Sequence, residues 1–169
     1  MGIAANQARL MTLTARQNDL EYKAQQISAI KMRLSQTTST LAQDYSKALN
    51  NYTKLNSAEQ IAKANPNAKF TVNADGTYVQ DPKGTTTAAG LVQAVADQIH
   101  AGTVSTANGY LTLQQGRYTT ETEQISAQEK VYDMELTQVN TEHDAIKTEY
   151  DAIKSLVGDN VEKSFNVFG

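Results

Sequence analysis

The 169-residue chain contains no cysteine and no tryptophan, and it has three phenylalanines. Without thiols it cannot form a disulfide, use a cysteine nucleophile or bind zinc through thiolates. With so few large aromatic rings, a compact aromatic core is not expected. The core must therefore be formed mainly by the 22 alanines together with leucine, isoleucine and valine. This composition favours helices that lie close together along a seam.

Long hydrophobic runs are also missing. The first nine residues lack the basic lead and apolar run of a secretory signal, and no stretch approaches the roughly 20 apolar residues that cross a bilayer. We therefore expect no membrane span, and either export without a cleaved signal or a cytoplasmic location. The net charge of −3 gives no basic field that would call for nucleic acid.

Charged residues make up only 20% of the chain, while uncharged polar residues are abundant, with 20 Thr, 15 Gln and 12 Asn. Amide and hydroxyl groups can be buried against a neighbour at a smaller cost than charges. Such a composition suits a surface that packs against copies of itself. A soluble helical protein with compositional drift is the simpler alternative.

Residues 1–64 predict one long coiled-coil helix, because apolar positions recur with the alternating steps of three and four of a heptad. One row is nearly pure: Leu13, Leu20, Ile27, Leu34, Leu41, Ala48 and Leu55. The second row is weaker: Ile3, Leu10, Gln17, Ala24, Lys31, Thr38, Tyr45 and Tyr52. The hydroxyl-rich patch from Ser35 to Thr40 competes for backbone hydrogen bonds, so a bend or break is expected there.

Residues 65–118 predict a small α+β insert. The Asn65-Pro66-Asn67 sequence ends the first helix, and two β-compatible stretches at 68–72 and 77–80 flank a Gly-containing turn, which indicates a β-hairpin. Thr85 to Thr87 can cap a helix over 88–100. Its apolar face comprises Leu91, Val92, Val95 and Ile99. Residues 110–113 fit a strand or a helical turn equally well.

Residues 119–169 predict a second coiled-coil helix, whose heptad seam is Tyr132, Leu136, Val139, His143, Ile146, Tyr150, Ile153 and Val157. Residues 1–54 carry seven bases and three acids, whereas residues 119–169 carry four bases and eleven acids. Opposite charges favour pairing of the two segments. The expected fold is mainly α, with long terminal helices paired as a coiled-coil hairpin around the insert.

Residues able to carry chemistry are scarce, and we predict no catalytic, cofactor-binding or metal site. Phosphate-binding glycine loops, the HExxH pattern and a calcium loop do not occur. His143 is interpreted as a polar seam residue that sets the register of the two helices. His100 is interpreted as a residue at a helix C-terminus, where a positive charge interacts favourably with the helix dipole. The bases Arg9, Arg16, Lys23 and Lys31 could track phosphates, but the acidic last segment is the favoured partner. The sequence thus predicts a protein that is not an enzyme.

Terminal heptads, a β-containing insert, no Cys or Trp, and a surface rich in Ala, Thr, Asn and Gln together resemble the axial proteins of bacterial flagella and type III secretion appendages. The resemblance is one of layout and composition. It implies that the terminal helices pair to build an inner tube, that the insert faces outward, and that export needs no cleaved signal. A secretion chaperone is a further partner that it implies.

Sequence and resemblance together predict a structural subunit that self-assembles through its terminal helices into a bacterial filament or appendage. The predicted assembly seam comprises Leu13, Leu20, Ile27, Leu34, Leu41, Leu136, Val139, Ile146, Tyr150, Ile153 and Val157. The alternative is a soluble intracellular coiled-coil adaptor or chaperone that holds one partner helix.

Overall fold

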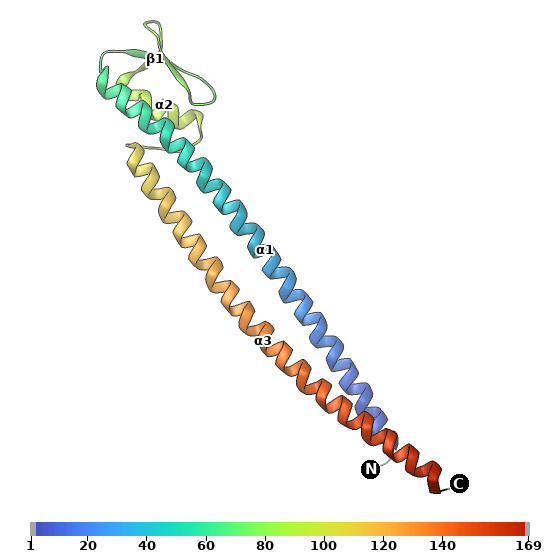
Figure 1. Cartoon of the computed structure of the whole chain (residues 1–169). Coiled ribbons are helices and arrows are strands. Elements are labelled where there is room, and N and C mark those ends of the chain that lie inside the picture. The colour runs from blue at the N-terminus through green and yellow to red at the C-terminus, as the bar shows by residue number, and fades with distance from the viewer. Residues whose placement is uncertain (1–2, 168–169) are drawn as a thin grey trace. The chain divides into compact units, whose positions relative to one another are not determined.

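Two long helices frame a small insert in the computed structural model, which describes residues 3–167 of the chain, with side chains from 4 to 163. Helix α1 runs over Ile3–Ala64 and helix α3 over Ala107–Val167. Between them lie strands β1 (Lys69–Val72), β2 (Tyr78–Gln80) and β3 (Thr86–Thr87), the 3-10 turn η1 (Ala88–Gly90) and helix α2 (Leu91–Gln98). Figure 1 shows α1 and α3 alongside one another, which confirms the predicted mainly α fold with a hairpin of terminal helices.

The chain divides into two units. The first contains the residues up to Ser35 together with those from Ser126 onward, and the second contains Gln36–Ile125. The boundary in α1 falls at the hydroxyl-rich patch, but the helix is continuous there. The Thr40 hydroxyl donates to the Gln36 carbonyl at 3.1 Å, so it bonds back onto its own helix instead of breaking it.

The first unit is a pair of antiparallel helices joined by a narrow hydrophobic seam. Leu13, Ile146 and Ile153 are buried in one cluster, against which Leu20 and Tyr150 pack. Ile27 and Val139 are also buried, at 3% and 2% exposure. Burial recurs at alternating steps of three and four along both helices, which is the periodicity that one-sided packing of helices requires.

The second unit is built around Phe70, Leu55, Leu91 and Val95, which are fully buried. Leu55 comes from the end of α1, Phe70 from β1, and the other two from α2, so the insert covers one face of α1. The sheet order is β2-β1-β3, and β1 pairs antiparallel with both neighbours. The predicted β-hairpin of 68–72 and 77–80 is confirmed.

Strand β3 was not expected from the sequence, because it is a two-residue strand at Thr86–Thr87. These threonines were predicted to cap a helix, but the Thr87 side chain makes no capping hydrogen bond. The predicted helix over 88–100 is instead the turn η1 followed by α2, which ends at Gln98. A left-handed His100 (φ 54°) terminates it, with the Ala101 N–H donating to the Ala96 carbonyl at 2.8 Å.

The C-terminal helix begins at Ala107 and not at 119, so the insert ends at 106 and residues 110–113 are helical. The Asn108-Gly109 pair is a sequence typical of a turn. Two contacts hold the first turn helical instead: the Thr106 hydroxyl accepts the Gly109 N–H at 3.1 Å, and Tyr110 is buried in the core of the second unit.

Candidate functional site

The predicted seam residues of the first unit lie between α1 and α3 of the same chain. Five of them are buried: Leu13, Ile27, Val139, Ile146 and Ile153. Five others are partly buried: Leu20, Leu34, Leu136, Tyr150 and Val157. Leu41 is partly buried in the second unit. The structure therefore uses these residues to pair the two helices of one molecule, and their predicted role in assembly between molecules stays a prediction.

Charged groups border this seam in a regular order. Arg9 forms an ion pair with Glu149, with its Nε donating at 2.9 Å, and Lys31 forms one with Asp133. Both pairs join a base of α1 to an acid of α3, as the opposite charges of the two segments predicted. One and two heptads from the Arg9–Glu149 pair, the sequence again has a base on α1 and an acid on α3, Arg16 with Glu142 and Lys23 with Glu135. This repeat of opposite charges favours antiparallel pairing of the two helices.

His143 lies at the seam, with its side chain 28% exposed. Its Nε2 is 3.5 Å from Glu21 of α1, and its Nδ1 is 3.6 Å from Asp144 on its own helix. Glu21 and His143 also line a small cleft of about 150 Å³ together with Leu20, Ala24, Val139 and Asn140. Each ring nitrogen of His143 thus has a carboxylate nearby, and this polar position suits register selection within the seam.

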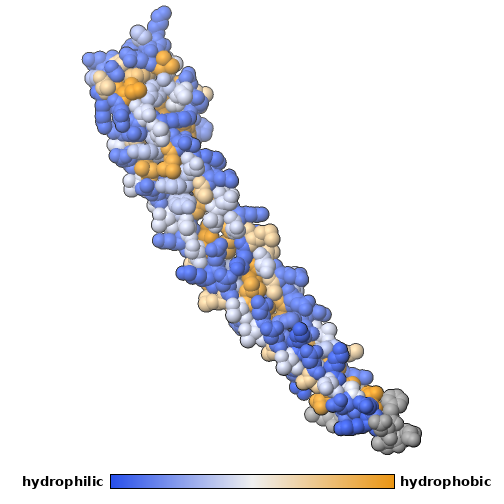
Figure 2. All heavy atoms as spheres, in the orientation of Figure 1, coloured by the Kyte–Doolittle hydropathy of each residue, from blue (hydrophilic) through white to orange (hydrophobic). Residues whose placement is uncertain are grey.

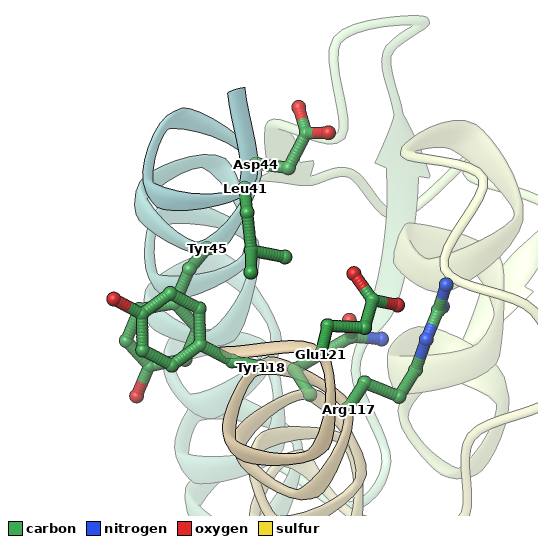
Figure 3. A pocket seen from close by; sticks show the side chains of 7 residues that line it. Leu41, Asp44, Tyr45, Arg117, Tyr118 and Glu121 are labelled. Carbon is green, nitrogen blue, oxygen red and sulfur yellow. The ribbon is translucent and has the colours of Figure 1, made fainter. Parts of the chain in front are cut away.

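A second cleft, of about 240 Å³, lies in the other unit and is shown in Figure 3. Tyr45 of α1 stacks on Tyr118 of α3 with ring centroids 4.5 Å apart. Leu41 points toward the space beside the rings, whereas the charged ends of Asp44, Arg117 and Glu121 lie away from the rings. The heptad pattern did not predict this pair of tyrosines, although Tyr118 is in heptad phase with Tyr132.

The start of α3 is held by a carboxylate from α1. One oxygen of Glu59 accepts the Ala107 N–H at 3.0 Å, and the other accepts from Lys63 at 2.6 Å. The Lys63 hydrogen bond, followed by that from Ala107, lowers the pKa of Glu59 below its ordinary value. Glu59 thus acts as a helix cap from a distant part of the chain, and sequence patterns of local capping could not reveal it.

Two further groups of the insert have shifted pKa values. Hydrogen bonds from the Thr77 side chain and backbone lower the pKa of Asp75, which shapes the tight turn of the hairpin. Burial raises the pKa of the Tyr78 phenol. Asp75 lies in the hairpin turn and Tyr78 in strand β2, so both pKa shifts are explained by the packing and hydrogen bonds of the hairpin.

Within residues 3–167, no helix is long and apolar enough to cross a membrane. The described side chains also contain no group of three or more His, Asp or Glu residues placed to hold a metal ion. Comparison with known proteins adds nothing further: no protein-family model, no curated protein and no solved structure matches the chain.

Proposed function

We propose that the protein is a structural subunit that assembles with copies of itself through its terminal helices. The observation that carries the proposal is the amount of surface the fold leaves open. The chain exposes 11422 Å², against about 8,200 Å² for a compact monomeric protein of 18.4 kDa. A two-helix seam buries one narrow stripe of each helix, and the remaining faces are available to neighbouring molecules.

The exposed surface has a composition that supports contacts between molecules. Figure 2 shows hydrophobic residues as separate patches among hydrophilic ones on the face that it draws. Exposed large hydrophobic side chains occur in both units, among them Met11, Met32, Val79, Leu113 and Met134. Removing each such side chain from water lowers the free energy, which favours association.

The proposal extends to a bacterial filament or secretion-related appendage, in which the subunit leaves the cell without a cleaved signal and has no enzymatic role. The support for this step is the layout of two long terminal helices with a small α+β insert between them in the chain, together with the abundance of uncharged polar residues. In such an assembly, the seam would hold the two long helices of each subunit together as a hairpin. The insert would lie on the outer surface of the assembly.

Light scattering and negative-stain electron microscopy on the same samples, over a wide range of concentration, test the proposal. We expect mass to grow with concentration and filaments or tubes to appear. A second sample carrying Ile27→Asp, which places a charge in the buried seam, should lose helicity and assembly together. A wild-type chain that stays a monomer at the highest concentration would exclude the proposed function.

A second candidate function is a soluble adaptor or chaperone that holds one partner. An open groove of about 500 Å³ in the second unit favours it, and this groove is lined by Glu59, Ala62, Lys63, Pro66, Ala88, Ala89, Val92, Ser105 and Thr106. Its apolar floor could receive a segment of a partner chain. Stoichiometry separates the candidates, because an adaptor forms a complex of fixed size, whereas a subunit grows without limit.

A further inference from the structure

The face of α1 that points away from the seam in the first unit carries a second repeat. Steps of three and four connect exposed residues that we call the outer α1 stripe: Ala8, Met11, Ala15, Asn18, Tyr22, Gln25, Ala29 and Met32. No member is charged. In an ordinary two-helix pair the outward heptad positions are the usual place for charged residues, because they remain in water.

Helix α3 carries a matching repeat on its own outward face. The outer α3 stripe comprises Ala127, Val131, Met134, Gln138, Thr141, Ala145, Thr148, Ala152 and Ser155, all exposed and all uncharged. Its threonines are already partnered, because Thr141 and Thr148 donate to carbonyls of their own helix at 2.8 Å. The hydroxyls of these two residues would therefore need no new partner when the stripe is covered.

Charged residues are common on both helices, so their absence from the stripes is specific to position. Up to Ser35, α1 carries five bases and two acids, and from Ser126 to Lys163, α3 carries four bases and nine acids. None of these charged residues belongs to either stripe. The stripes also collect large apolar side chains: Met11 is 76% exposed, Tyr22 64% and Met134 65%. Among the described residues of α1 up to Ser35, the exposed large hydrophobic residues all belong to its stripe.

We propose that the outer α1 stripe of one molecule packs against the outer α3 stripe of a second copy of this chain. The uncharged stripes would supply the contact, and the flanking charges would select the partner. A contact between two α1 helices would bring net positive charge against net positive charge, and one between two α3 helices would bring negative against negative. A contact between α1 and α3 brings opposite charges together.

This pairing is heterologous, because two different surfaces meet. Each copy then keeps one unused α1 stripe and one unused α3 stripe, so the contact repeats from copy to copy and forms either a closed ring or an open filament. The inference rests on the proposed function and adds to it the faces through which the subunits meet. It also gives the buried seam and the outer stripes separate roles, one within the molecule and one between molecules.

Two double variants test the inference, each with one stripe blocked by charges. The α1 variant carries Tyr22→Glu and Met32→Glu, and the α3 variant carries Val131→Glu and Met134→Glu. All four positions are exposed, so circular dichroism and the melting temperature should show a folded chain. We expect each variant alone to be a monomer at concentrations where the wild type assembles, since an unpaired charge is costly in an uncharged contact.

Mixing the two variants gives the sharper result. Each retains the stripe that the other lacks, so an equimolar mixture should form a one-to-one dimer by mass photometry or analytical ultracentrifugation and should stop there. The control is Leu156→Glu, which makes the same kind of change at a position of α3 that is 56% exposed and lies outside the stripe. The control should assemble like the wild type.

The possible outcomes separate the inference from the proposed function. If the wild type assembles and both folded double variants assemble equally well, the stripes are not the contact, while the subunit function stands. If one variant alone forms dimers, or the mixture forms none, the heterologous pairing is wrong. If the wild type itself remains monomeric, both the function and the stripe contact are excluded.

Discussion

At the scale of single residues, several contacts in this protein depend on partners far away in the sequence. Glu59 caps a helix that begins 48 residues later, and Gly84 lies against the backbone of Phe70. Local patterns cannot reveal such contacts, because each residue type is ordinary for its immediate surroundings. The hairpin turn is different: the Asp75-Gly76 pair, with Gly76 at φ 78°, follows a local rule and was predicted.

Glu59→Gln should reduce stability most clearly at neutral pH. In the folded chain the pKa of Glu59 lies below its ordinary value of 4.5, so its ionised form contributes stability above that value. This contribution is lost as the pH falls through the lower pKa of the folded state. By comparison with helix caps, we expect a loss of about 0.5–2 kcal/mol near pH 7. Urea unfolding of both proteins at pH 7 and below pH 4 checks this, and a difference that stays constant with pH would contradict it.

Two glycine-to-alanine substitutions should change stability in opposite directions. Gly84 lies in the loop between β2 and β3, and a Cβ there would lie 2.4 Å from the carbonyl oxygen of Phe70 in β1, so Gly84→Ala should push this loop away from β1 and cost about 1–3 kcal/mol. A Cβ on Gly116, in the body of α3, meets nothing within 4 Å. Gly116→Ala should therefore stabilise the chain by about 0.8–1 kcal/mol. Thermal unfolding measures both changes in stability, and equal signs would show that Gly84 does not lie against the Phe70 backbone.

At the scale of elements, the periodicity of apolar residues predicted the buried faces of the long helices. It did not predict element boundaries that depend on tertiary contacts. The heptads of α1 and α3 predicted which face of each helix is buried, because one-sided burial needs a repeat near 3.5 residues. The start of α3 at Ala107 was missed, since Gly109 and Gly116 lower helix propensity locally while Tyr110 and the distant Glu59 compensate for them. Strand β3 was missed because two residues carry no detectable alternation.

Charge reversal tests the register of the seam at the level of paired elements. Arg9→Glu places an acid beside Glu149 and should lower stability by less than about 1 kcal/mol, since both side chains are largely exposed. The double reversal, Arg9→Glu with Glu149→Arg, should restore most of the loss. A double-mutant cycle by urea unfolding at low salt gives the coupling energy. Zero coupling between these two positions would mean that the helices do not pair in this register.

At the scale of the whole molecule, the proposed assembly links stability to concentration. An assembled state that binds only folded subunits stabilises them by mass action, so the melting temperature of the wild type should rise with protein concentration. The double variants with blocked outer stripes should melt at one temperature throughout, because they have the same buried seam but no contact between copies. The seam alone would give the wild type and the variants the same concentration-independent melting temperature. Differential scanning calorimetry over a 100-fold range of concentration therefore distinguishes a hairpin that is complete by itself from one that is stabilised by its neighbours.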